Sequence, residues 1–309
     1  MPTSPPEPVF EILGFWADVG IGSYRGGVIL RILCHEEVRT ILPDRDPFAH
    51  KGKFGKILLL CGSEGYTGAA ALASMGALRS GAGLVFLGVP RSIYAIEAVK
   101  LTEPVVFPLP DADGKLSADA IPEILERLPK MDAVLIGPGL GQSQDVTHVV
   151  KTVLEQAKCP VVLDADGINA VSKHIDILRG RKFSTILTPH DGEFIRLGGV
   201  IGEDRVAAAE GMAQELGCVM LLKGHRTVIT DGTSTYINHT GNPGMAVGGS
   251  GDVLAGIIVS LLGQGIEPLE AAACGAWLHG AAGDRCAAEL GQYGMLPTDM
   301  LNVLPRLLK

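Results

Sequence analysis

The feature that most constrains the fold is an alternation, from residue 56 onward, of short runs that are apolar at nearly every position with longer segments of helical character. Such strands are typical of a sheet covered on both faces, because a strand with one wet face alternates apolar and polar residues. The sequence therefore predicts an α/β fold with a parallel sheet between helical layers. The expected strands are 56–61, 83–89, 132–137, 160–166, 184–189, 218–224 and 227–232, and the expected helices are 68–81, 117–128, 145–157, 204–217, 252–263, 268–285 and 298–308.

Composition agrees with a heavily buried chain and excludes several classes of protein. Of the 309 residues, 47% are hydrophobic and 19% are charged, which argues against disorder. The formal net charge is −8 and Lys and Arg form no dense cluster, so a nucleic-acid binder, which needs a basic face, is not expected. The most apolar run, 253–262, is shorter than the roughly 18 residues of a membrane span. We therefore predict no nucleic-acid partner and no membrane contact.

The six cysteines contain no C-x-x-C pair, and most lie in apolar stretches. A zinc site or a disulfide framework would need paired spacings. We therefore expect reduced, buried thiols in a cytoplasmic protein.

The first 35 residues differ in composition from the rest. They begin with the Pro-rich PTSPPEP, continue with irregular sequence interrupted by glycines, and lack the basic start of a signal peptide. We interpret residues 1–35 as a leader-like or linker-like segment and residues 36–309 as one domain.

Glycine-rich loops follow two of the expected strands. CGSEGYTGAA (61–70) and GPGLGQS (137–143) each come between a strand and a helix. Glycines let a backbone approach a ligand closely, and free amides at a helix start suit an anion. The first loop matches neither a dinucleotide-binding nor a P-loop pattern, and the second is a G-x-G-x-G run. A plain turn stays an alternative for both. Because right-handed crossovers put the ends of parallel strands on one side, we expect such loops at one edge of the sheet.

Polar side chains follow other strands at the same predicted edge. LDADGIN ends one strand with Asp164 and Asp166, which could hold Mg²⁺ through water or phosphate; alternatively, Asp166 could simply cap a helix. LTPHDGEF gathers Thr188, His190 and Glu193 after another strand. We predict a functional role for this second group, with a structural histidine as the alternative.

LLKGHRT (221–227) places a lysine directly after a strand. Lys223 could neutralise a phosphate there, and Thr227 could donate a hydrogen bond to a ligand. The alternative is a solvated hairpin.

The glycine-rich segment GNPGMAVGGSGD (241–252) leads directly into an apolar helix. Its amides can converge on an anion, and the helix start adds partial positive charge. Together they could stabilise a phosphoryl group in transfer. Asp252 could accept the proton of an attacking hydroxyl, or it could be only an N-cap. We predict that Asp252 is a catalytic base.

In order and spacing, these motifs resemble those of a known family. G-G-S-G-D followed by V-L-A-G resembles the signature of the ribokinase-like superfamily. The segment 50–85, GPGLG, LDADGIN, LTPHDGEF, LKGHRT and GNPGMAVGGSGDVLAG together resemble the ADP-dependent NAD(P)H-hydrate dehydratases, which repair damaged nicotinamide dinucleotides. The similarity covers roughly residues 36–306. It implies an α/β fold of the ribokinase-like type, with three layers (α/β/α) and a mostly parallel central sheet.

The resemblance also implies an activity. Such an enzyme phosphorylates the ring hydroxyl of the S epimer of NADH hydrate or NADPH hydrate, and loss of phosphate then restores NADH or NADPH. ADP is the implied donor (ATP in eukaryotic relatives), with AMP and phosphate as products of the ADP reaction and Mg²⁺ as cofactor. A homo-oligomer, tetrameric or larger, and a separate NAD(P)H-hydrate epimerase are the implied partners.

By the same resemblance, several residues acquire roles. Asp252 would be the base, and it would contact the hydrated dinucleotide together with Ala69, Gly139 and His190. Glu193 corresponds to the acid of an N-x-x-E motif and would act on Mg²⁺ indirectly. The implied nucleotide-binding residues are Lys223, Gly224, His225, Arg226, Thr227, Gly248, Gly249, Ser250 and Gly251.

The sequence departs from the family pattern at two of these sites. Asp191 stands where proline is frequent, and we expect its carboxylate to favour the protonated form of the neighbouring His190. Ser250 stands where threonine is frequent and keeps the hydroxyl. ADVGIG (17–22) faintly resembles the segment that joins epimerase and dehydratase halves in fused relatives.

Two alternatives come from different classes. The first is a small-molecule kinase of the same fold, acting on hydroxymethylpyrimidine or a sugar, which would usually show N-x-x-E at residues 190–193. The second is a nucleotide-binding regulatory or scaffold protein without catalysis. Asp252 together with every phosphate loop favours an enzyme over the second alternative, although motifs alone do not prove turnover.

Overall fold

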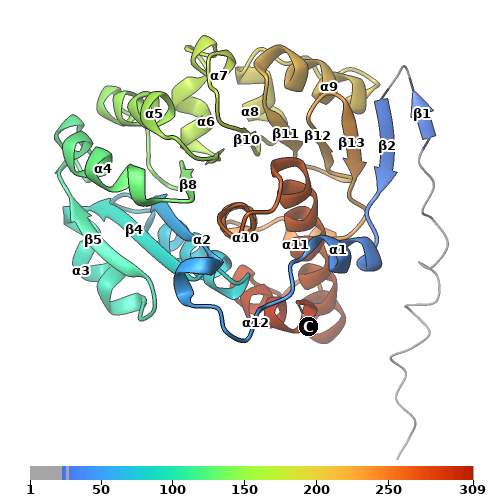
Figure 1. The fold of residues 1–309 in the computed structure, drawn as a ribbon, viewed down its shortest axis with the longest axis horizontal. Helices are drawn as coiled ribbons and strands as arrows, with labels where there is room; N and C mark the ends of the chain where they lie inside the picture. Colours follow the sequence, from blue (N-terminus) through green and yellow to red (C-terminus); the bar gives the residue numbers. More distant parts are fainter. Residues whose placement is uncertain (1–22, 26–27, 309) are drawn as a thin grey trace, which may run out of the picture.

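The computed structural model describes residues 23–25 and 28–308. An 11-stranded sheet forms its centre, with helices on both faces (Figure 1). The strands of this sheet are β1 (Ser23–Arg25), β2 (Val28–Ile32), β3 (Lys56–Leu60), β4 (Leu84–Pro90), β5 (Val105–Leu109), β8 (Ala133–Ile136), β9 (Val161–Leu163), β10 (Thr185–Leu187), β11 (Val219–Leu222), β12 (Val228–Thr230) and β13 (Ser234–Ile237). A separate small hairpin consists of β6 (Asp111–Ala112) and β7 (Lys115–Leu116).

The α-helices lie mostly between consecutive strands, as crossovers of a parallel sheet require. They are α1 (His35–Ile41), α2 (Thr67–Arg79), α3 (Arg91–Lys100), α4 (Ile121–Arg127), α5 (Gln144–Gln156), α6 (Asp166–Val171), α7 (Asp176–Arg179), α8 (Asp191–Arg196), α9 (Arg205–Leu216), α10 (Ser250–Gly263), α11 (Pro268–Leu290) and α12 (Pro297–Leu307). Among the described residues, no helix is long and apolar enough to cross a membrane.

The strand order is β1-β2-β13-β12-β11-β10-β9-β8-β3-β4-β5. Neighbours from β11 through to β5 are all parallel, whereas β1–β2, β11–β12 and β12–β13 are antiparallel. The predicted mostly parallel sheet is therefore confirmed.

The chain reverses its direction of travel across the sheet at β3. From β3 it moves outward to β4 and β5, and it then returns to β8 on the other side of β3. The loops after β3 and β8 meet at this switch point, where Gly62 N donates to Pro138 O (2.8 Å) and Ser63 Oγ donates to Gly139 O (2.7 Å). Open α/β sheets bind ligands at such a crevice.

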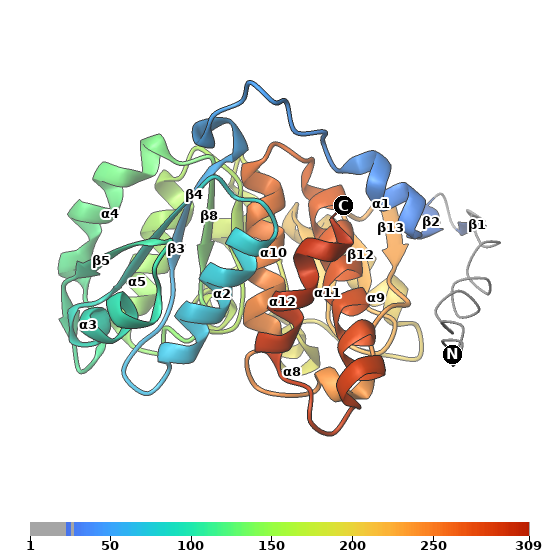
Figure 2. The ribbon, with the colours of Figure 1, turned by 90° about the horizontal axis from the view of Figure 1, so that it is seen from below.

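The core has two halves, one on each face of the sheet. In β3, Ile57 and Leu59 belong to one apolar cluster, and Leu58 and Leu60 belong to the other. This explains why the strand is apolar at successive positions. Helices α2, α10, α11 and α12 lie side by side over the first cluster (Figure 2), and α4, α5 and α9 cover the second. The predicted three layers are confirmed.

Most expected elements are confirmed within a few residues, with informative exceptions. The strand expected over 160–166 ends at Leu163, because α6 begins at Asp166. In the helix expected over 117–128, residues 118–120 are 3₁₀, and Ser117 makes no capping hydrogen bond. The sequence patterns did not predict α3, β5, β13, the hairpin of β6 and β7, or the short helices α1, α6, α7 and α8.

The segment 1–35 supplies two strands to the sheet. β2 pairs in parallel with β13, and β1 pairs with β2. Part of the leader-like segment therefore extends the sheet, while the boundary at residue 36 stays a prediction. ADVGIG (17–22) lies outside the described residues.

All six cysteines are unpaired, and all except Cys34 are buried. The expectation of buried free thiols is therefore confirmed for five of the six, and Cys34 is half-buried.

Candidate active site

The glycine-rich segment ends where α10 begins. Gly249 is the N-cap, with a φ of 96°, and a Cβ there would lie 2.4 Å from Leu72 Cδ1. A side chain at this position would therefore be strained and would clash. Since the helix starts at Ser250, Asp252 lies inside its first turn, and the alternative that Asp252 is the N-cap is wrong.

The first turn of α10 presents unused amide groups. The amide of Ser250 donates to Val247 O (3.3 Å), and that of Val253 donates to Gly249 O (3.2 Å). Within the described part of the chain, the amides of Gly251 and Asp252 have no acceptor at hydrogen-bonding distance. Such orphan donors at a helix start can bind an anion.

The remainder of α10 is held by close contact with α2. A Cβ on Gly256 would lie 2.2 Å from Ala73 O, and one on Gly76 would lie 2.7 Å from Val253 O. The glycine of the V-L-A-G signature therefore lets two helix backbones touch. This contact fixes where the first turn of α10 lies.

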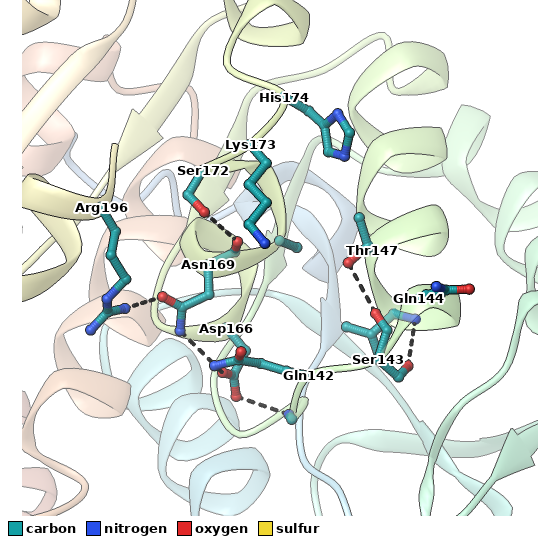
Figure 3. A pocket seen from close by; sticks show the side chains of 13 residues that line it. Gln142, Ser143, Gln144, Thr147, Asp166, Asn169, Ser172, Lys173, His174 and Arg196 are labelled. Atoms are coloured by element: carbon teal, nitrogen blue, oxygen red, sulfur yellow. Dashed lines mark hydrogen bonds between the residues drawn. The ribbon is translucent and has the colours of Figure 1, made fainter. Parts of the chain in front are cut away.

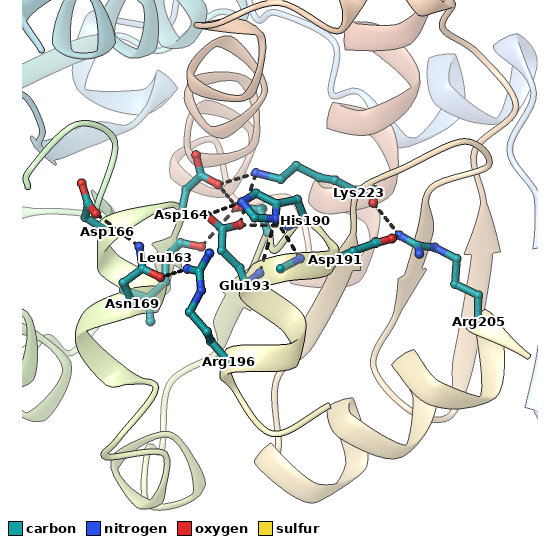
Figure 4. Close-up of polar contacts among 12 residues, drawn as sticks. Leu163, Asp164, Asp166, Asn169, His190, Asp191, Glu193, Arg196, Arg205 and Lys223 are labelled. Atoms are coloured by element: carbon teal, nitrogen blue, oxygen red, sulfur yellow. Dashed lines mark hydrogen bonds and ion pairs between the residues drawn. The ribbon is translucent and has the colours of Figure 1, made fainter. Parts of the chain in front are cut away.

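Lys223, which is half-buried, and two buried carboxylates form a cluster (Figure 4) against that first turn. Lys223 Nζ is 2.8 Å from Asp164 Oδ1 and 3.9 Å from Glu193 Oε2. Thr188 Oγ1 also donates to Asp164 Oδ1 (2.7 Å). A Cβ on Gly251 would lie 3.5 Å from Lys223 Nζ. The ends of β9, β10 and β11 thus bring these motifs together at one edge, as predicted.

The pKa values of Asp252 and Lys223 are both shifted by this environment. Burial and the charge of Asp164 raise the pKa of Asp252 to about 6, while Lys223 opposes this rise. Burial lowers the pKa of Lys223, but Asp164 and Glu193 outweigh this effect and raise it overall. Asp252 is therefore a stronger base than an ordinary carboxylate, and Lys223 stays charged.

His190 has a local structural role. It is the N-cap of α8, and its Nδ1 accepts hydrogen bonds from the amides of Gly192 (3.0 Å) and Glu193 (3.3 Å). In return, Glu193 Oε2 accepts from His190 N (2.9 Å). Asp191 forms an ion pair with Arg205 (2.5 Å), and the guanidinium compensates the charge of the Asp191 carboxylate. The expected influence of Asp191 on His190 stays a prediction.

The loop that follows β11 is a tight turn. Thr227 Oγ1 donates to Gly224 O (3.0 Å), and Arg226 has a φ of 57°. His225 and Arg226 are exposed. The hydroxyl of Thr227 therefore already makes a hydrogen bond that closes the turn. The local geometry is that of a solvated hairpin loop.

Two predicted substrate contacts lie directly against each other. Gly139, in the loop after β8, has a φ of 63°, and a Cβ there would lie 2.8 Å from Ala69 Cβ. Ala69 lies in the first turns of α2, one turn before Leu72, which contacts Gly249. Both residues therefore lie near the start of α10.

Sequence reasoning missed two supports from α11. Asp284 accepts hydrogen bonds from Gly241 N (2.8 Å) and Asn242 Nδ2 (2.9 Å), which anchors the glycine-rich segment. His279 Nε2 lies 2.9 Å from Ser250 O, and burial lowers the pKa of His279 to about 4. The neutral ring therefore donates to this carbonyl. Nothing in the sequence marks either residue, because both contacts depend on helix packing.

The carboxylates of this site fit Mg²⁺ only if water and nucleotide phosphates supply the other ligands. Among the described residues, no group of three or more His, Cys, Asp or Glu side chains could hold a metal ion. Asp164 Oδ1 is occupied by Lys223 and Thr188, whereas Oδ2 faces Gly251 and makes no hydrogen bond. Since Mg²⁺ in nucleotide sites needs only one or two carboxylates besides water and phosphate, Asp164 fits such an ion.

Comparison with known proteins gives consistent matches. The family model for NAD(P)H-hydrate dehydratase matches residues 57–306. The bifunctional NAD(P)H-hydrate repair enzyme Nnr of Moorella thermoacetica is 47% identical over 286 residues, which are 90% of this chain and 54% of that protein. The chain therefore spans about half the length of the bifunctional relatives it matches.

Solved structures resemble the whole fold. A ribokinase-like superfamily protein from Enterococcus faecalis aligns with a TM-score of 0.80 at 28% identity, covering 93% of this chain and 98% of that one. The ADP/ATP-dependent NAD(P)H-hydrate dehydratase of Bacillus subtilis, co-crystallised with ATP and Mg²⁺, aligns with a TM-score of 0.76 at 34% identity, covering 89% and 96%. The fold is ribokinase-like, and the chain belongs to the NAD(P)H-hydrate dehydratase family.

Proposed function

We propose that this chain dehydrates the S epimer of NADH hydrate or NADPH hydrate, with ADP as phosphoryl donor, giving NADH or NADPH together with AMP and phosphate. The main support for this proposal is the arrangement of groups in the first turn of α10. It combines a carboxylate of raised pKa, Asp252, with two unused amides, those of Gly251 and Asp252 itself. The Bacillus subtilis relative is named as an ADP/ATP-dependent enzyme, and ATP therefore stays a second candidate donor.

In the first step, the Asp252 carboxylate takes the proton of the ring hydroxyl. The hydroxyl oxygen forms a bond to the terminal phosphorus of ADP, and the bond from that phosphorus to the bridging oxygen breaks, which releases AMP. The amides of Gly251 and Asp252 face the charge that develops on the phosphoryl oxygens. Lys223, held by Asp164, adds positive charge beside Gly251.

In the second step, the ring carbon–oxygen bond breaks and phosphate leaves with the electron pair. Loss of the neighbouring ring proton to solvent water restores the double bond. The first-turn amides that held the phosphoryl group can hold the departing phosphate. When bound, Mg²⁺ would neutralise phosphate charge, and Asp164, with Glu193 acting indirectly, would hold it.

The remaining predicted contacts complete the proposal. Ala69, Gly139 and His190 would contact the hydrated dinucleotide. The nucleotide would lie against residues 223–227 and 248–251. A homo-oligomer, a separate epimerase and a cytoplasmic location, in which the six free cysteines would stay reduced, stay predictions.

The proposal is tested by incubating NADH hydrate with Mg²⁺ and either ADP or ATP while reduced-nicotinamide absorbance is followed. Absorbance should return only with nucleotide, and Asp252→Asn should lower kcat by about 10²- to 10⁴-fold, as expected for loss of a general base. Asp299→Asn, which alters a first-turn carboxylate of α12, is the matched control and should keep kcat.

Other outcomes would point to the alternatives. A phosphorylated product that accumulates without NADH would indicate a kinase. ADP binding by calorimetry without any turnover would indicate a regulatory protein.

A further inference from the structure

A cavity of about 750 Å³ has several polar side chains in its wall (Figure 3). It lies near the candidate active site, because Asp166 and Arg196 of its wall are two and three residues from Asp164 and Glu193 in the chain. The loop after β8, the start of α5, the helix α6 and Arg196 of α8 surround it. Its lining includes neither Asp252 nor Lys223. The volume is in the range of small-molecule pockets. Ten of the thirteen lining residues have polar side chains, so a ligand with several polar groups is favoured.

The one carboxylate in the lining is occupied in building the wall. Asp166 accepts hydrogen bonds from Gly141 N (2.8 Å), Asn169 Nδ2 (3.2 Å) and Gln142 Nε2 (3.4 Å). These bonds join the loop after β8 to the start of α6. The Asp166 carboxylate is therefore already hydrogen-bonded to three N–H groups of the cavity wall.

Two cations of the lining lack a counter-charge. Lys173 and Arg196 are both exposed. Arg196 donates to Asn169 Oδ1, which is neutral. Within the described part of the chain, neither cation has a carboxylate within 4.0 Å. In a protein of net charge −8, two uncompensated cations around one cavity favour an anionic ligand.

The cavity lies close to the proposed substrate site. Gly139, which touches Ala69, is two residues from Gly141 in the cavity wall, so their Cα atoms are at most about 7.6 Å apart. Asp164 and Asp166 likewise follow the same strand, one in the lysine cluster and one in the cavity. A ligand longer than the distance from Gly139 to Gly141 can therefore reach both the proposed substrate site and the cavity.

We propose that the cavity binds the adenosine phosphate half of the hydrated dinucleotide, with Lys173 and Arg196 facing its phosphates. The hydrated nicotinamide would then lie between Gly139 and Asp252. The inference rests on the proposed function and adds a site for the part of the substrate that does not react. A 2′-phosphate, which NADPH carries and NADH lacks, would gain most from the two cations.

The kinetic test uses the double variant Lys173→Gln/Arg196→Gln. Its KM should rise about tenfold for NADPH hydrate, which corresponds to one lost charged hydrogen bond, and less for NADH hydrate. The KM for nicotinamide mononucleotide hydrate, which lacks the adenosine half, should not change. Lys182→Gln, which changes an exposed lysine outside the cavity, is the control for loss of a surface cation and should leave every KM unchanged. Equal KM changes for all three hydrates, or none, would overturn the proposal.

A binding test separates this inference from the proposed activity. Adenosine 2′,5′-bisphosphate is titrated into the protein by calorimetry at saturating ADP, so that the co-substrate site is filled. Wild type and Lys182→Gln should bind the probe alike, and the double variant should bind it about tenfold more weakly. No binding to wild type, or equal binding to all three proteins, would refute the cavity assignment. If wild type binds the probe but never restores NADH, the proposed activity fails and the cavity assignment stands.

Discussion

The two ends of α10 serve opposite purposes. From Val253 onward the helix is buried and apolar, and Gly256 lets it touch the backbone of α2. Its first turn instead carries Asp252, a carboxylate whose burial near Asp164 raises its pKa to about 6. One end thus stabilises the fold, and the other costs stability in order to hold a base and two open amides. The difference indicates that the catalytic turn depends on the packed end to stay in place.

The largest effect on the catalytic end is expected from Lys223→Met. This change leaves Asp164 and Glu193 buried without their cation, and the free energy of unfolding should fall by about 3–5 kcal/mol. Because Lys223 opposes the rise in the pKa of Asp252, the acid limb of the pH–activity profile should also move to higher pH. Chemical denaturation and a pH–rate profile measure these effects, with Lys182→Met as control. An unchanged profile would mean that Lys223 does not act on the base.

A smaller effect on stability is expected at the packed end of α10, where Gly256 can be compared with Gly211, another helical glycine. Gly256→Ala brings a Cβ to 2.2 Å from Ala73 O, whereas Gly211 in α9 is exposed with no heavy atom within 4 Å of such a Cβ. Gly256→Ala should therefore lower stability by about 1–3 kcal/mol, and Gly211→Ala should raise it by up to about 1 kcal/mol. Thermal unfolding of both variants checks the opposite signs. If both were stabilised, close contact with α2 would not constrain α10.

The sequence predicted the elements whose patterns are local. Strands such as β3 and β8 are buried on both faces and therefore read as continuous apolar runs. β13 was missed because Ser234 and Thr235 interrupt its apolar pattern, and Thr235 is satisfied by Thr230 and Glu210 on other elements. Short helices such as α8 have too few residues to show a helical period.

For the candidate site, the sequence placed the motifs at the correct edge but not their contacts. Lys223 and Asp164 are 59 positions apart, and only the sheet order brings their side chains together. Lys223 was assigned to the nucleotide through the resemblance, and its ion pair with Asp164 was not foreseen. The cap formed by His190 and the support from His279 likewise depend on packing that no spacing shows.

The Asp252 carboxylate costs stability in the folded state. Its pKa is about 6 when folded against a reference value of 3.8, so the folded protein holds this proton more tightly than the unfolded chain. The contribution of Asp252 to the free energy of unfolding should therefore fall by roughly 1–3 kcal/mol as the pH rises from about 4 to about 6. Asp252→Asn removes this dependence.

The most direct test is the free energy of unfolding of wild type and Asp252→Asn, measured by denaturant titration from pH 4 to pH 8. We predict that the inactive variant is the more stable protein above about pH 6, and that the difference shrinks towards pH 4. A variant that is equally or less stable than wild type across this range would show that the folded protein does not hold Asp252 at a raised pKa.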